Sequence, residues 1–148
     1  SYMLRTEHLF RFYPNREIYP SRFGQNLQLM LPVAHKRKCG FIDEPLMEYI
    51  QITNSLSREN NPLKKKEKAV KNAEGYYDIR RHMIEILHMT DTEKAYWSTV
   101  ARGILYRRKI DIAIEHEDEL LLKESIEKLK SEDLLDMNDR IVFSLFDI

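Results

Sequence analysis

The sequence predicts an α+β fold that is mainly helical, with a few short strands before residue 60 and three to four helices after it. Two observations carry this prediction. Beyond residue 60, apolar residues recur at roughly helical intervals, as they do along the buried face of an amphipathic helix. Before residue 60, short apolar runs are interrupted by proline, glycine and asparagine, which limit strands and form turns. By length the chain is one domain, and we divide it into two regions, residues 1–60 and residues 61–148.

Residues 20–32 contain the clearest helix of the first region. Its apolar stripe consists of Phe23, Leu27, Met30, Leu31 and Ala34. Gln25, Asn26 and Gln28 lie off this stripe at the mouth of the helix, and Gly24 allows a sharp entry just before them. Pro32 removes one backbone hydrogen bond, so the helix is expected to end or kink at the preceding residue. The same pattern is typical of a short amphipathic helix that only packs on a sheet.

Three short strands are expected around this helix, over residues 2–5, 38–42 and 46–52. Thr6 suits the N-cap of a helical turn that follows the first strand. Cys39 lies in the second strand, where we expect a buried and unreactive thiol. A chain that begins directly on a strand is typical of a fragment, so we expect a further segment before this one.

The helical region contains local start signals. Asn61-Pro62 suits an N-cap and first turn, and Gly75 is a candidate interruption of the helix that follows. Residues 90–93, Thr-Asp-Thr-Glu, have the capping-box pattern and start a second helix. A third helix is expected over residues 121–129. The periodicity of residues 141–146 is compatible with helix or strand, and we assign them to helix.

Composition narrows the functional class. Lys+Arg and Asp+Glu both number 24, so the formal net charge is zero, which argues against a nucleic-acid binder. The single cysteine excludes an internal disulfide and fits a reducing compartment. No apolar run approaches the roughly twenty residues that a transmembrane helix needs. We expect a soluble, cytoplasmic protein, in which the basic runs 64–66 and 107–109 are candidates for peripheral contact with the inner membrane.

Residues 22–32, Arg-Phe-Gly-Gln-Asn-Leu-Gln-Leu-Met-Leu-Pro, resemble a block of the bacterial family 2 glycosyltransferases. In that block Gly-Gln-Asn-Trp-Gln opens a helix and a Leu-Pro pair follows. This chain departs from it at Leu27, where the block has tryptophan. The match continues through residues 38–49 to residues 54–58, and it reaches back to residues 3–5. It covers the first region, whereas the tail resembles the helical extension of such enzymes only loosely.

The resemblance implies an enzyme with the A-type fold that moves a hexose from a nucleotide sugar to a polysaccharide or lipid-linked glycan. Residues 1–60 then belong to the acceptor side of its catalytic domain. The family holds a divalent metal, Mn²⁺ or Mg²⁺, through an Asp-x-Asp motif, and this chain contains no such motif. The metal and the nucleotide sugar are therefore expected in a donor half outside this chain, and the fragment alone is expected to be inactive. No metal ligands are predicted within the chain.

The resemblance also indicates candidate site residues. Gln25 and Asn26 stand where many family members have a Glu-Asp pair whose second residue is the catalytic base. An amide cannot accept a proton at neutral pH, so Asn26 and Gln25 are expected to bind the acceptor instead. Capping of the helix is the alternative. Weak candidates for the base are Glu17, Asp43 and Glu44, unless the base lies in the missing half.

Four further residues are candidate substrate contacts. Arg22 and Arg58 flank the matched blocks, and arginine suits bidentate contact with a diphosphate. Ser55 and Ser57 are candidates to line an acceptor groove. For all four, a solvated surface position is the alternative.

A function of a different class also fits the sequence. The amphipathic helices after residue 60 are compatible with a helical interaction module that docks a partner or forms a homodimer through this tail, without a catalytic role. Tyr96 and Trp97 fit either the core of such a tail or a surface that faces a partner.

Overall fold

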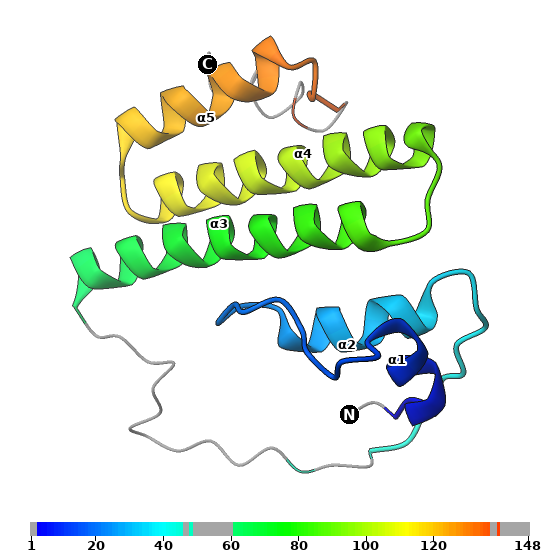
Figure 1. The fold of residues 1–148 in the computed structure, drawn as a ribbon. Helices are drawn as coiled ribbons and strands as arrows, with labels where there is room; N and C mark the ends of the chain where they lie inside the picture. The colour runs from blue at the N-terminus through cyan, green and yellow to red at the C-terminus, as the bar shows by residue number, and fades with distance from the viewer. Residues whose placement is uncertain (1–2, 46–47, 49–60, 137–138, 140–148) are drawn as a thin grey trace.

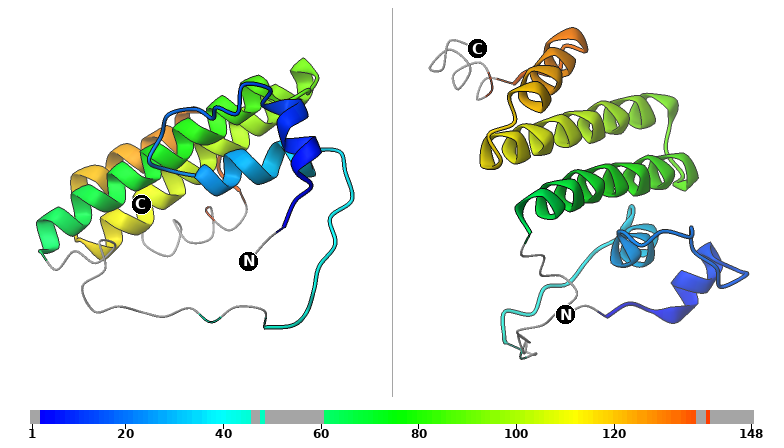
Figure 2. Two further views of the ribbon diagram at one scale, coloured as in Figure 1. Left: turned by 60° about the horizontal axis from the view of Figure 1, so that its bottom comes forward. Right: turned by 90° about the vertical axis from the view of Figure 1, so that its left-hand side faces the viewer.

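The computed structural model describes residues 3–45, 48, 61–136 and 139, and five helices lie in this part of the chain (Figure 1). They are α1 (Thr6–Phe12), α2 (Gln25–Ala34), α3 (Pro62–Ile86), α4 (Asp91–Glu115) and α5 (Glu119–Ser131). Helices α3, α4 and α5 run side by side in alternating directions, and α2 packs with α1 on the side of α3 that faces away from α4 (Figures 1 and 2). The mainly helical part of the predicted fold class is confirmed.

Helices α3 and α4 begin at the expected signals, whereas the cap of α5 was not predicted. The Asn61 side chain accepts hydrogen bonds from two first-turn amides of α3, at 3.0 and 3.3 Å. Thr90 and Glu93 form a complete capping box at the start of α4. Asp118 caps α5 by accepting from the Leu121 amide at 3.1 Å. These side chains satisfy amides that have no partner inside the helix, which explains why each helix starts where it does.

The predicted strands are not seen among the described residues, none of which lies in a strand. Residues 3–5 and 38–42 are irregular chain, and most of 46–52 falls outside the described residues, as does 141–146. A strand needs backbone hydrogen bonds to a neighbour, and in the described part of the chain no such bond joins these segments. Cys39 is consequently exposed, contrary to the expected buried thiol.

The first helix also starts one residue earlier than expected. Arg5 is the N-cap of α1, and Thr6 is already helical. The Arg5 carbonyl oxygen accepts hydrogen bonds from the amides of His8 and Leu9, which defines the first turn without help from a threonine side chain. The cap prediction for Thr6 was therefore wrong by one position, whereas the helix itself is confirmed.

Gly75 does not interrupt α3, which runs unbroken from residue 62 to residue 86. The ring of Phe23 lies against this glycine, so closely that a Cβ atom at position 75 would be 2.0 Å from Phe23 Cδ2. Glycine weakens a helix by about 1 kcal/mol relative to alanine. Here the missing side chain leaves the space that an aromatic ring from the first region occupies.

Pro32 does not end α2, which continues for two further residues. A proline has no N–H to donate to the carbonyl oxygen of Gln28, four residues earlier. The Tyr13 hydroxyl donates to that oxygen instead, at 3.0 Å. The expected end at Leu31 is therefore wrong, and a distant side chain replaces the lost backbone hydrogen bond.

Tyr13→Phe is expected to lower the free energy of unfolding by about 1 kcal/mol, because it leaves the Gln28 carbonyl oxygen without its donor. In a Pro32→Ala background, where a backbone N–H is available to the same oxygen, the loss is expected to shrink. Urea unfolding of the two single variants and the double variant measures this coupling. Tyr96→Phe, at an exposed tyrosine, is the control, and equal losses in both backgrounds would contradict the replacement.

The core has three clusters of buried apolar residues, and each cluster joins two neighbouring parts of the fold. Ala73, Leu105 and Ile112 join α3 to α4, and Ile110, Ile126 and Leu129 join α4 to α5. The third cluster, Ile79, Met83 and Leu87, lies on the opposite face of α3 and contacts residues of the first region, among them Phe23, Leu27 and Leu31. Helix α3 therefore buries two faces, one of which carries the first region.

Arg107 of α4 holds the chain that follows α5. Its guanidinium donates to both carboxylate oxygens of Asp139, most closely at 2.6 Å, and to the Leu134 carbonyl oxygen at 2.8 Å. Asp136 and Asp139 also accept hydrogen bonds from each other's backbone amides, both at 2.9 Å. Burial raises the pKa of the Asp139 carboxyl, but hydrogen bonds from Arg107 and Asp136 outweigh burial and lower this pKa from its ordinary 3.8.

We expect Asp139→Asn to lower the free energy of unfolding by about 1 kcal/mol at pH 7. Because the folded-state pKa is lowered, this stability is present above the unfolded pKa of 3.8 and is lost as pH falls through the folded value. Urea unfolding between pH 7 and pH 2 should show the variant and the parent protein converging at low pH. Glu127→Gln, at an exposed position of α5, is the control, and a pH-independent difference would contradict the assignment.

Candidate functional site

Gln25 and Asn26 are exposed in the first turn of α2 and line an open cavity of about 470 Å³. Leu27, Met30 and Leu31 of the same helix and Tyr76 of α3 also line it. Gly24, which has φ +60°, makes the expected sharp entry, and a Cβ atom there would lie 3.0 Å from Ile79 Cγ2. The entry brings the chain close to α3 and leaves the two amide side chains at the surface, as the sequence predicted.

The loop before α2 is held by a network of tyrosines around Gln28, which is 0% exposed. The Gln28 Nε2 atom donates to the Tyr19 carbonyl oxygen at 3.2 Å, and the Tyr19 hydroxyl donates to Asp78 Oδ2 at 3.1 Å. The Tyr19 ring stacks on His82 with 4.4 Å between the ring centroids. Its hydrogen bond to Asp78 raises the pKa of the Tyr19 hydroxyl. These contacts fix the start of α2 against α3.

The rim of the cavity is fixed as well. Gln25 Nε2 donates to the Ser21 carbonyl oxygen at 3.2 Å, and Ser21 Oγ accepts from the Phe23 amide at 3.1 Å. The turn before α2 is therefore tied to the first amide side chain. Capping, the alternative interpretation of these amides, is not how α2 starts: its N-cap is Gly24, without any side-chain cap.

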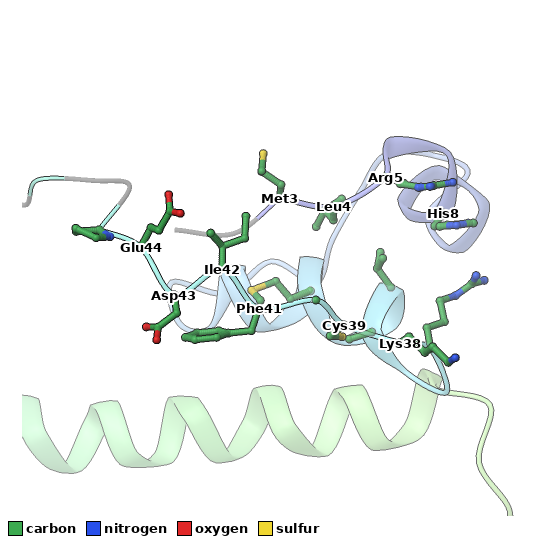
Figure 3. Close-up of a pocket in the computed structure, with 16 residues that line it drawn as sticks. Met3, Leu4, Arg5, His8, Lys38, Cys39, Phe41, Ile42, Asp43 and Glu44 are labelled. Atoms are coloured by element: carbon green, nitrogen blue, oxygen red, sulfur yellow. The ribbon is translucent and has the colours of Figure 1, made fainter.

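A second, larger cavity of about 1150 Å³ lies between residues 3–8, the last turns of α2 and residues 37–45 (Figure 3). Asp43 and Glu44, two of the candidate bases, lie at one end of it (Figure 3). Met3, Phe41 and Ile42 line it with side chains that are largely exposed. Met30 and Ala34 line both cavities, so the two share a wall on α2.

Two of the remaining predicted site residues are described by the structure, and neither lines a cavity. Glu17 and Arg22 are exposed and line neither one. Ser55, Ser57 and Arg58 lie outside the described residues. Gln25 and Asn26 therefore line the smaller cavity, Asp43 and Glu44 line the larger one, and the two cavities share a wall on α2.

Sequence reasoning missed Tyr76. The helical periodicity of α3 includes its neighbour Tyr77, which packs toward α4. Tyr76 therefore lies on a different face of α3 from Tyr77, and it lines the cavity beside Gln25 and Asn26. The only available signal was the apolar character of a residue off the buried stripe.

The basic runs that were candidates for membrane contact are largely paired with carboxylates. The ion pairs of these runs include Lys65–Glu115, Lys66–Asp118, Arg107–Asp139, Arg108–Asp111 and Lys109–Glu74. Hydrogen bonds from the lysines lower the pKa values of Glu115 and Asp118. This pairing leaves less net positive charge on these helices than the runs alone suggest. Among the described residues, no helix is long and apolar enough to cross a membrane.

Within the described part of the chain, no three His, Cys, Asp or Glu side chains lie close enough to hold a metal ion. Comparison of the chain with models of protein families, with curated proteins and with solved structures gives no significant match. The assignment of the candidate site therefore rests on the geometry described above and on the resemblance found in residues 3–58.

Proposed function

We propose that this chain forms the acceptor side of a family 2 glycosyltransferase that moves a hexose from a nucleotide sugar to a polysaccharide or lipid-linked glycan. The observation that carries the proposal is the exposed pair Gln25 and Asn26 above an apolar cavity. In the resembling family this position, at the mouth of the same helix, faces the reacting sugars. Amides and apolar side chains are suited to binding a neutral acceptor there.

In the proposed reaction, an acceptor hydroxyl attacks the anomeric carbon of the donor sugar and loses its proton to a carboxylate. Asp43 and Glu44 are the candidates within this chain, because they line the cavity that shares a wall with the amide pair. Glu17 is the weaker candidate, since it lines neither cavity. Gln25 and Asn26 would orient the acceptor by hydrogen bonds. Ser55, Ser57, Arg22 and Arg58 remain proposed contacts of the acceptor or the diphosphate.

The donor half is proposed to lie outside this chain. A divalent ion, Mn²⁺ or Mg²⁺, would stabilise the leaving diphosphate there. The exposed side chains of Met3, Phe41 and Ile42 around the larger cavity support such a covering half, because clustered apolar groups at a surface mark contact sites. These side chains belong to residues 3–5 and 38–42, which are irregular chain.

The test measures transfer of labelled hexose from UDP-hexose, with Mn²⁺, to a glycan acceptor. The chain alone is expected to give no transfer, whereas the chain joined to the residues encoded upstream of it is expected to be active. In that longer protein, Asp43→Asn or Glu44→Gln is expected to lower kcat by about a hundredfold or more if it removes the base. Asn26→Ala should raise KM for the acceptor. Arg16→Ala, at an exposed residue outside both cavities, is the control.

Two outcomes would contradict this proposal. Acceptor-dependent turnover by the chain alone would show that no donor half is missing. An inactive longer protein that binds neither UDP-hexose nor a glycan would remove the transferase assignment altogether.

A second candidate function is a docking or dimerisation module, and the surface of α4 favours it. Trp97 and Ile104 lie seven residues apart on one helix face, and both are exposed. Tyr96 packs edge-on against Trp97, with 5.2 Å between ring centroids. Size-exclusion chromatography with light scattering discriminates the two functions. A stable dimer that Trp97→Ser disrupts supports docking, and a monomer contradicts dimerisation.

A further inference from the structure

Both regions of the chain build the smaller cavity. Tyr76 comes from α3, and the other lining residues are Gly24, the N-cap of α2, and residues of α2 itself. The Tyr76 side chain is 45% exposed. Its ring lies 6.0 Å from the ring of Phe23, measured between centroids. Phe23 is itself held against Gly75, one residue before Tyr76. The exposed ring is therefore supported from one side and open on the other.

The chemistry of the lining indicates a neutral ligand with one apolar face. Among the residues that the structure describes, no lysine, arginine, aspartate or glutamate lines this cavity, and the lining residues are apolar, aromatic, glycine and amide residues. Its volume of about 470 Å³ falls within the range of about 300–1,000 Å³ that is typical of small-molecule sites. A pyranose ring has an apolar face of C–H groups and hydroxyls at its edge. An aromatic ring matches the face, and amides donate to and accept from the hydroxyls.

We propose that Tyr76 is the platform on which a neutral pyranose ring of the acceptor lies, with Gln25 and Asn26 binding its hydroxyls. This inference rests on the proposed function and adds to it a residue of the helical region. Met30, which is partly exposed in the same cavity, completes the apolar surface beside the ring. A neutral sugar suits this cavity better than the anionic nucleotide sugar, because its described lining residues include no cationic side chain.

The test is a titration followed by ¹H–¹⁵N NMR, in which the side-chain amides of Gln25 and Asn26 report binding. The probes are methyl β-D-glucopyranoside and methyl β-D-galactopyranoside, with cyclohexanol as an apolar ring without the sugar hydroxyl pattern. At least one glycoside is expected to shift both amides and to bind more tightly than cyclohexanol. Tyr76→Leu should weaken this binding about threefold to tenfold, the usual worth of an aromatic contact, and Tyr76→Phe should preserve it.

Tyr96→Leu is the matched control, since Tyr96 is an exposed tyrosine of α4 that does not line the cavity. Its binding should equal that of the parent protein, and the amide spectra should show that every variant folds. Glycoside binding that Asn26→Ala weakens and Tyr76→Leu does not would overturn the platform while leaving the transferase proposal intact. Equal binding of cyclohexanol, or no binding of either glycoside, would also overturn the platform. The transfer assay described above then decides the proposed function separately.

Discussion

Gly75→Ala is expected to lower the free energy of unfolding by about 1–3 kcal/mol, although alanine is the better helix former by about 1 kcal/mol. The new Cβ atom would meet three ring atoms of Phe23, at 2.0, 2.4 and 2.6 Å. Such contacts force the ring to move, and the ring is attached to the turn that precedes α2. The clash should therefore outweigh the gain in helix propensity, and α2 should loosen from α3.

The measurement is urea unfolding, together with amide hydrogen exchange of α2. In a Phe23→Ala background the ring is absent, so the same Gly75→Ala change is expected to become stabilising. Gly103→Ala is the control within a helix. Its Cβ atom would lie 2.7 Å from the guanidinium of Arg107, which hydrogen-bonds Asp139, so this variant should disturb the chain after α5 and leave α2 in place. A stabilising Gly75→Ala in the parent protein would contradict the packing described for Phe23.

Ile79→Ala is expected to have the larger effect, a loss of about 2–4 kcal/mol in the free energy of unfolding. Ile79 is 0% exposed and lies in the cluster that joins α3 to the first region. Truncation removes apolar contacts and leaves a cavity that the helices on either side cannot fill. Ile79→Val should cost only about 1 kcal/mol, because it removes a single methylene.

Ile112→Ala is the matched control, because Ile112 is also 0% exposed but packs between α3 and α4. Both alanine variants should be less stable in urea. Only Ile79→Ala should accelerate hydrogen exchange in α2 more than in α5. Identical exchange patterns in the two variants would contradict the assignment of separate clusters to the two faces of α3.

The helices after residue 60 could be predicted because their start signals are local. Asn61 and the pair Thr90 and Glu93 each satisfy amides within three residues, so the sequence nearby contains all the information. The local sequence cannot decide in the same way whether residues 38–42 form a strand. A strand exists only with a partner, and the described residues provide none.

The candidate site was predictable in part. Gln25, Asn26 and Gln28 all lie off the apolar stripe of α2, and the first two are exposed as this phase indicates. Gln28 is fully buried instead, because the tyrosine-containing segment before α2 covers it. Tyr76 could not be found, since its place in the cavity depends on how α2 crosses α3. The continuation of α2 through Pro32 could not be predicted either. The hydrogen bond that replaces the lost one comes from the Tyr13 hydroxyl, fifteen positions before the carbonyl oxygen that accepts it.

The exposed position of Cys39 matters for any study of self-association. It is the single cysteine of the chain, and its thiol is open to solvent in the irregular segment after α2. Air oxidation can join two copies through this sulfur and mimic a native homodimer. Mass measurements therefore need a reducing agent or a Cys39→Ser variant. The same thiol also offers a unique attachment point for a fluorescent reporter that senses whether the neighbouring cavity becomes covered.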